Sequence, residues 1–117
     1  MRALIPALLA VSLLGAATAR AEDAAGDAKH GRQLFVATGC FECHGLVGQG
    51  SAQTGGPRLA PEPMPAASLT QLLRAPLNQM PAYSEKALSD RDIADIHAYL
   101  ASIPAPPAVK DIPLLNY

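Results

Sequence analysis

The stretch Cys40-Phe41-Glu42-Cys43-His44 decides how this 117-residue chain is to be interpreted. It holds both cysteines of the sequence and one of its three histidines. Because the thiols are separated by two residues, one turn of helix presents both sulfurs on the same side. His44 directly follows the second thiol, so the stretch gathers two sulfur nucleophiles and an imidazole within a single turn.

The C-x-x-C-H spacing is the attachment pattern of haem c, in which both thiols add to the vinyl groups of one haem. The adjacent histidine then lies beneath the iron as its proximal axial ligand. We therefore predict one covalent haem c, bound through Cys40 and Cys43, with His44 as an iron ligand. A haem also accounts for the composition, because aromatic residues make up only 4% of the chain and there is no tryptophan to fill a core.

Three other interpretations of the motif explain less. A structural zinc site needs four ligands, and beyond the motif only His30 and His97 remain, both expected at the surface. A thioredoxin-like redox pair requires a strand before the motif and a parallel sheet around it. A disulfide between Cys40 and Cys43 is the simplest alternative in an oxidising compartment, but it leaves the small core unexplained.

Ahead of the motif, residues 1–21 have the features of a secretory signal peptide. A basic start is followed by an apolar run over 3–17 and by a small-x-small pattern at 19–21, which predicts cleavage before Glu22. An uncleaved membrane anchor needs about 20 apolar residues, and this run is shorter and contains Pro6. We therefore expect a periplasmic protein with no membrane insertion after cleavage.

The charge balance excludes nucleic-acid binding. Ten acidic residues stand against nine basic ones, for a net charge of −1. Removal of the first 21 residues makes the chain more acidic, and nothing in it could neutralise a run of phosphates. Lysine is scarce as well, with only Lys29, Lys86 and Lys110. Docking to a partner through a ring of lysines is therefore not expected.

Two helices are predicted close to the motif. The first covers about 27–38, with Asp27 as its N-cap and Gly39 just past its end. A second, short helix covers 68–74. It ends there because Pro76 disfavours helical backbone at the residue before it. The segments between the helices are rich in glycine and proline, which predicts loops.

The last helix has the clearest signals. It begins at Ser89, which forms a capping-box pattern with Asp92, and it ends before Pro104. Its apolar positions recur at steps of three and four residues, and they are Ile93, Ile96, Leu100 and Ile103. The organisation predicted is one domain over residues 22–104, followed by an extended Pro-rich tail over 105–117.

The sixth ligand of the iron separates electron transfer from gas binding or catalysis. Met80 lies beyond the predicted helix at 68–74 and is followed by Pro81, which stiffens the loop that would hold the sulfur. Met64 lies in a Pro-rich segment much nearer the motif. We predict Met80 as the ligand, although methionine also serves as a gap-filler in cores.

Three further segments follow the motif in an order that matches a known family. They are Gly56-Pro57-Arg58-Leu59, Met80-Pro81-Ala82-Tyr83 and Leu88-Ser89-Asp90. With the C-x-x-C-H motif, they make residues 26–104 resemble the class I cytochromes c of the short bacterial type. The resemblance implies an all-α, small cytochrome c fold, with three or more helices packed around one covalent haem and with crossed N- and C-terminal helices.

The resemblance also implies roles for single residues. Gly31, Phe35 and Tyr99 match the positions at which the first and last helices of the family cross. The carbonyl of Pro57 is expected to accept a hydrogen bond from Nδ1 of His44, which fixes the orientation of the ligand ring.

The chain departs from the family in two ways. The loop between His44 and Met80 is shorter than in the mitochondrial-type proteins, so more of the haem edge is expected to be exposed. The tryptophan that many relatives use to bind a haem propionate is missing, and Arg58, Arg74 and Tyr83 are the substitutes we propose for it.

Together these features predict a periplasmic monohaem cytochrome c. We expect a one-electron carrier between a dehydrogenase and a downstream cytochrome or oxidase, and not an enzyme. An alternative is a dedicated cytochrome c subunit bound stably to a flavin- or quinone-cofactor dehydrogenase, with the apolar tail after Pro104 as its anchor. A third interpretation, a haem enzyme or gas sensor, requires that Met80 does not bind the iron.

Overall fold

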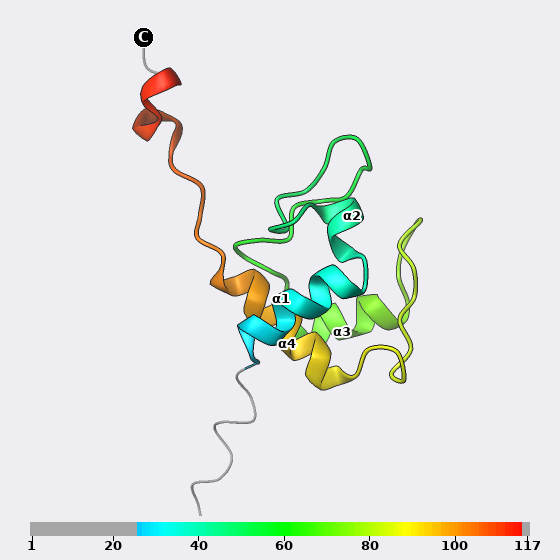
Figure 1. The fold of residues 1–117 in the computed structure, drawn as a ribbon. Coiled ribbons are helices and arrows are strands. Elements are labelled where there is room, and N and C mark those ends of the chain that lie inside the picture. Colours follow the sequence, from blue (N-terminus) through cyan, green and yellow to red (C-terminus); the bar gives the residue numbers. More distant parts are fainter. Residues whose placement is uncertain (1–25, 116–117) are drawn as a thin grey trace, which may run out of the picture.

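A computed structural model describes residues 26–115 of the chain as helices and loops (Figure 1). The α-helices are α1 (Ala28–Ala37), α2 (Cys40–His44), α3 (Ala66–Arg74) and α4 (Asp90–Ser102). Within this part of the chain no strand forms, and the pair Ser51 and Gly56 makes only an isolated bridge. The all-α prediction is confirmed, while the predicted signal peptide over 1–21 lies outside the described residues.

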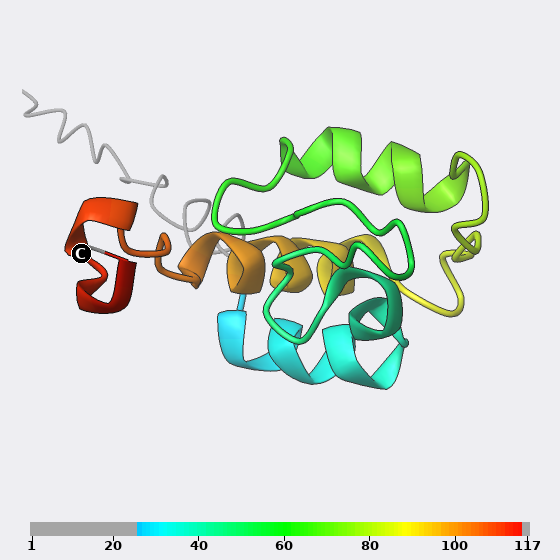
Figure 2. The ribbon, with the colours of Figure 1, turned by 90° about the horizontal axis from the view of Figure 1, so that it is seen from above.

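The first and last helices, α1 and α4, are far apart in the sequence but pack against each other in the fold (Figures 1 and 2). Gly31 is buried at their contact, and a Cβ at this position would overlap the backbone carbonyl of Asp95 in α4. One turn later, the rings of Phe35 and Tyr99 meet with their centroids 5.6 Å apart and their planes at 58°, a tilted arrangement that aromatic pairs favour. The predicted crossing is therefore confirmed at all three residues.

The apolar face predicted for the last helix does form the core. Leu88 and α4 bury their aliphatic side chains against α3, whose Leu69 and Leu73 are also buried. Ile103 lies at the end of this face and is only partly buried. The buried core is made of Phe35, Ala60, Leu69, Leu73, Leu88, Ile93, Ile96, Tyr99 and Leu100.

Both long helices begin at the predicted caps. The side chain of Asp27 accepts hydrogen bonds from the first turn of α1, and Ser89 and Asp92 form a reciprocal capping box at the start of α4. Such caps satisfy backbone N–H groups that have no partner within the helix. The third helix, α3, begins two residues earlier than predicted, at Ala66 after the N-cap Pro65.

A buried carboxylate, Asp95, joins the two crossing helices and was not anticipated from the sequence. One oxygen accepts the backbone N–H of Asp27 at 2.7 Å, and the other lies 2.8 Å from Nδ1 of His30. Burial raises the pKa of Asp95, but the hydrogen bonds from His30 and Asp27 and the charge of Arg91 outweigh it and hold the pKa below its ordinary value. Asp95 therefore fastens the start of α1 to the middle of α4.

Past Ile103 the chain leaves the helices (Figures 1 and 2). The tail is predicted to be extended throughout, but it contains two short 3-10 helices, η2 (Val109–Asp111) and η3 (Pro113–Leu115). These helices contact each other, and Val109 and Leu114 are exposed. The prolines at 104–107 keep the start of the tail extended, whereas the residues beyond them can close short turns.

Candidate haem site

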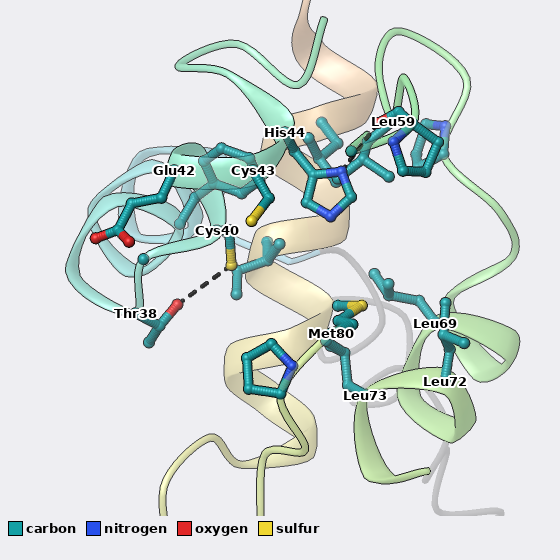
Figure 3. Close-up of a pocket in the computed structure, with 18 of the residues that line it drawn as sticks. Thr38, Cys40, Glu42, Cys43, His44, Leu59, Leu69, Leu72, Leu73 and Met80 are labelled. Atoms are coloured by element: carbon teal, nitrogen blue, oxygen red, sulfur yellow. Dashed lines mark hydrogen bonds between the residues drawn. The ribbon is translucent and has the colours of Figure 1, made fainter. Parts of the chain in front are cut away.

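A cavity of about 1190 Å³ opens between α2, α3 and the loop that carries Met80. Figure 3 shows how its walls are arranged. Cys40 and Cys43 lie along one edge, His44 enters from one side, and Met80 enters from the opposite side. Leu69, Leu72 and Leu73 of α3 complete the wall away from the cysteines.

The motif residues form α2 and bring both sulfurs to the cavity, as the spacing predicts. Cys40 is half-buried, and its sulfur lies 3.4 Å from the hydroxyl oxygen of Thr38. Burial raises the pKa of the Cys40 thiol, and the contact with Thr38 partly opposes this shift. Cys43 is exposed. Cys40 and Cys43 form no disulfide in this structure, so both thiols are available to bind haem.

His44 is buried, and its orientation is fixed by a single contact. Its Nδ1 lies 2.9 Å from the carbonyl oxygen of Pro57, which is the contact that the family resemblance implies. Because a carbonyl oxygen only accepts hydrogen bonds, Nδ1 carries the proton and donates it. In the neutral ring this leaves Nε2 unprotonated, which is the form that binds a metal.

The segment that supplies Pro57 lies against the backbone of α2. A Cβ at Gly56 would overlap the carbonyl group of Cys43, so only glycine allows this approach. The hydroxyl of Thr54 donates to the same carbonyl at 2.7 Å, and the N–H of Gly50 donates to the carbonyl of His44 at 2.8 Å. These contacts satisfy the carbonyls at the end of a very short helix.

Met80 lies across the cavity from His44 (Figure 3). It is half-buried and packs against the core cluster, as the half-buried ring of Tyr83 also does. Met64 lines the same cavity but is exposed. The structure therefore brings both methionines to the cavity and buries Met80 more deeply than Met64.

The three residues predicted to replace the missing tryptophan have different positions. Arg58 is exposed and lines the cavity. Tyr83 also lines it, and its hydroxyl donates to the carbonyl of Thr38 at 2.9 Å. Arg74 is outside the lining in the described part of the chain, and it donates to the carbonyl of Tyr83 and to Asp90.

The leucines of α3 were missed as site residues. The sequence predicts this helix, but we did not expect its leucines to line the cavity. Leu69, Leu72 and Leu73 recur at steps of three and one, which puts them on one face of a helix and could have indicated an apolar wall. For the hydroxyl of Thr54, in contrast, no sequence signal exists, because its acceptor lies on another segment.

The cavity meets the requirements of covalent haem. It offers two thiols along one edge, a buried imidazole with a free Nε2, a thioether on the facing wall and an apolar surface between them. A large apolar ring with two vinyl groups and an iron at its centre uses each of these features. The fold and the site therefore define a monohaem c-type cytochrome.

The comparison with protein families agrees. The family described as cytochrome C oxidase, cbb3-type, subunit III matches residues 26–100, and the chain belongs to this family. It is an electron-transfer protein with covalent haem c rather than an enzyme. Comparisons with curated proteins and with solved structures gave no match. Among residues 26–115, none of the helices has the length and apolar character needed to cross a membrane.

Proposed function

We propose that this protein is an exported one-electron carrier whose haem iron is held between His44 and Met80. The observation that carries the proposal is the placement of these two side chains on opposite walls of one cavity (Figure 3). If His44 and Met80 both bound the iron, no position would remain for a substrate or a gas, and the site would be suited to electron transfer.

When bound, haem c supplies an iron that alternates between the ferrous and ferric states. The chain contributes the surroundings. Pro57 holds the His44 ring in one tautomer, and a neutral thioether from Met80 favours the reduced state more than a second nitrogen ligand would. The leucines of α3 give the cavity an apolar wall, and an apolar environment would limit the solvent rearrangement that accompanies a change of charge at the iron.

Arg58 and Tyr83 complete the set of cofactor-binding residues that we propose. Arg58 is exposed at the cavity, so its guanidinium can meet a carboxylate such as a haem propionate with two hydrogen bonds. Tyr83 lines the cavity with its ring, while its hydroxyl is engaged by Thr38. We therefore assign the propionate contact to Arg58 and a packing role to Tyr83.

The rim of the cavity suggests how redox partners dock. Met64 is 39% exposed and Leu77 is 69% exposed, and both also line the cavity. We propose that these exposed apolar side chains meet a dehydrogenase as donor and a cytochrome or oxidase as acceptor. Transient redox contacts typically bury less than about 1,200 Å², so a small patch is sufficient.

The export route and the chain divisions belong to the same proposal. We place the signal peptide at residues 1–21, the cytochrome domain at 22–104 and the tail at 105–117, with the mature protein in the periplasm. The intact mass of the protein purified from its host tests this directly. The expected mass is that of the chain from Glu22 plus one haem, and the mass of the uncleaved chain would contradict export by cleavage.

Optical spectroscopy tests the ligation. The oxidised protein is expected to show the weak near-infrared band of a methionine–ferric iron bond, and the reduced protein is expected not to react with carbon monoxide. Met80→Ala should abolish the band and admit carbon monoxide, while Met64→Ala should change neither. Rapid binding of carbon monoxide by the unmodified protein would replace the carrier with a gas-binding or catalytic haem.

A stable subunit of a larger enzyme is the second candidate. Its support is the tail, which leaves the domain in Figure 1 and exposes Val109, Leu114 and Leu115, and the family description, which names an oxidase subunit. The partner that we propose for such a subunit is a flavin- or quinone-cofactor dehydrogenase, with the tail as the anchor. Co-purification of a partner that is lost when the chain is truncated after Ile103 would favour this candidate over the free carrier.

A further inference from the structure

The loop that carries Met80 makes weak contacts of its own. It joins α3 to α4, and the N–H of Met80 donates to the carbonyl of Leu77 at 3.4 Å, a long hydrogen bond. Asn78 has a left-handed backbone with a φ of 57°, which costs free energy for any residue with a side chain. The position of Met80 must therefore depend on contacts outside this turn.

Tyr83 supplies such contacts three residues after Met80. Its N–H donates to the carbonyl of Leu73 in α3 at 2.9 Å, and its hydroxyl donates to the carbonyl of Thr38 at 2.9 Å. Its own carbonyl accepts a hydrogen bond from Nη1 of Arg74 at 2.9 Å. Three residues of chain span at most about 10 Å, so an anchored Tyr83 restricts where Met80 can lie.

Arg74 connects this anchor to both flanking helices. It is the last residue of α3, and its second guanidinium nitrogen lies 2.6 Å from a carboxylate oxygen of Asp90, the first residue of α4. The side chain of Arg74 is 25% exposed, whereas that of Asp90 is 68% exposed. The exposed ion pair is screened by solvent, so the better-protected bond to Tyr83 contributes more to holding the loop.

We propose that Arg74, acting through Tyr83, is a positioning residue that keeps the sulfur of Met80 at the iron. The proposal rests on the His44 and Met80 ligation proposed above. A thioether is a neutral ligand, and its hold on the iron depends on the effective concentration that a closed loop provides. When Arg74 releases Tyr83, the loop can open and Met80 can leave, while the covalent thioethers and His44 keep the haem in place.

This role differs from a contact with a haem propionate. Both ends of the guanidinium group of Arg74 are engaged by protein oxygens, and Arg74 is outside the cavity lining in residues 26–115. A propionate partner tunes the charge near the iron and leaves the sulfur bound. Loss of a residue that anchors the loop, in contrast, would release the sulfur of Met80 from the iron.

The test uses the full holoprotein with Arg74→Gln, which removes the charge and at least one of the two hydrogen bonds. We expect the near-infrared band of the oxidised variant to weaken and carbon monoxide to bind the reduced variant about tenfold faster, as the loss of one charge-assisted hydrogen bond predicts. Tyr83→Phe, which keeps the backbone contacts, should shift both readouts in the same direction by less. Asp90→Asn should have the smallest effect of the three.

Arg32→Gln is the matched control, because Arg32 is exposed on α1, far along the chain from the loop. It removes the same charge and should leave both readouts unchanged. Circular dichroism at the measuring temperature establishes that each variant is folded. Arg74→Lys, which keeps the charge but reaches fewer partners, should recover part of the band.

Two results would overturn the proposal, and they can be told apart. If Arg74→Gln keeps the full band and stays inert to carbon monoxide while its reduction potential shifts, Arg74 acts on the haem charge and the loop is held by other contacts. If the unmodified protein itself lacks the band, the Met80 ligation fails and the positioning role fails with it.

Discussion

The two walls of the haem cavity are held by different kinds of contact. On the His44 wall, Pro57 and Thr54 contact residues only 13 and 11 positions away. On the Met80 wall, Tyr83 contacts the nearby Leu73 and Arg74, and its hydroxyl also reaches the carbonyl of Thr38, which is 45 positions away. The first wall is closed by contacts between residues near in sequence, whereas the second also needs a long-range contact that forms only when the helices have packed. Loss of tertiary structure should therefore release Met80 before His44.

The largest effect is expected where the His44 wall is attached to haem. Replacement of Cys40 and Cys43 by alanine should abolish covalent haem completely, because no thiol remains to form a thioether. Met80→Ala on the other wall should keep the full amount of covalent haem. Haem staining after denaturing electrophoresis measures this, and a haem-free Met80→Ala protein would mean that the walls do not act separately.

The next largest effect concerns the packing of the His44 wall. Gly56→Ala places a methyl group on the carbonyl of Cys43 and should lower the free energy of unfolding by about 3 kcal/mol. Gly55→Ala is the matched control, because its Cβ would meet open space and only its left-handed backbone carries a cost, of about 1 kcal/mol. Chemical denaturation of both variants gives the difference, and equal losses would contradict the close approach at Gly56.

On the Met80 wall, the turn before the methionine should respond more weakly. Asn78 has a φ of 57°, a conformation that asparagine tolerates better than alanine. Asn78→Ala should therefore cost about 1 kcal/mol, whereas Asn78→Gly should lie within about 0.5 kcal/mol of the unmodified protein. Thermal unfolding compares the two variants. If Asn78→Gly is less stable than Asn78→Ala, the turn is not strained at this residue.

The smallest effect concerns a long-range contact distant from both walls. The hydrogen bond to Asp95 raises the pKa of His30 above its ordinary value of 6.5, and the charges of Asp95, Asp92 and Asp27 add to this effect. A raised pKa means that the contact stabilises the fold while His30 is protonated. This contribution is complete below the ordinary pKa and is lost as the pH rises through the raised one.

The test of this pH dependence compares melting temperatures of the unmodified protein and His30→Gln from about pH 5 to about pH 9. At the acidic end the unmodified protein should have a slightly higher melting temperature than His30→Gln, and this difference between the two proteins should vanish at the alkaline end. His97→Gln, on the same helix as Asp95, serves as the control. A difference that grows with pH would contradict the assigned sign.

The contrast between the walls also explains what the sequence could predict. The caps at Asp27 and Ser89 and the apolar face of α4 depend on residues within one or two turns, and they follow from local spacing. The pairs of Arg74 with Asp90 and of His30 with Asp95 join segments that only the tertiary fold brings together. The sequence predicts Met80 as the ligand from Pro81 and from its place beyond the helix at 68–74, but it gives no signal for the contacts of Tyr83 with Arg74 and Thr38 that hold the loop.

Nuclear magnetic resonance of the reduced protein with ¹³C-labelled methionine methyl groups tests the central assignment most directly. A methyl group on an iron-bound sulfur lies over the haem ring, and the ring current shifts its signal far upfield. We predict one such signal that disappears in Met80→Leu and persists in Met64→Leu. Methionine signals that all remain at ordinary positions would show that Met80 does not bind the iron, and the carrier assignment would fall with it.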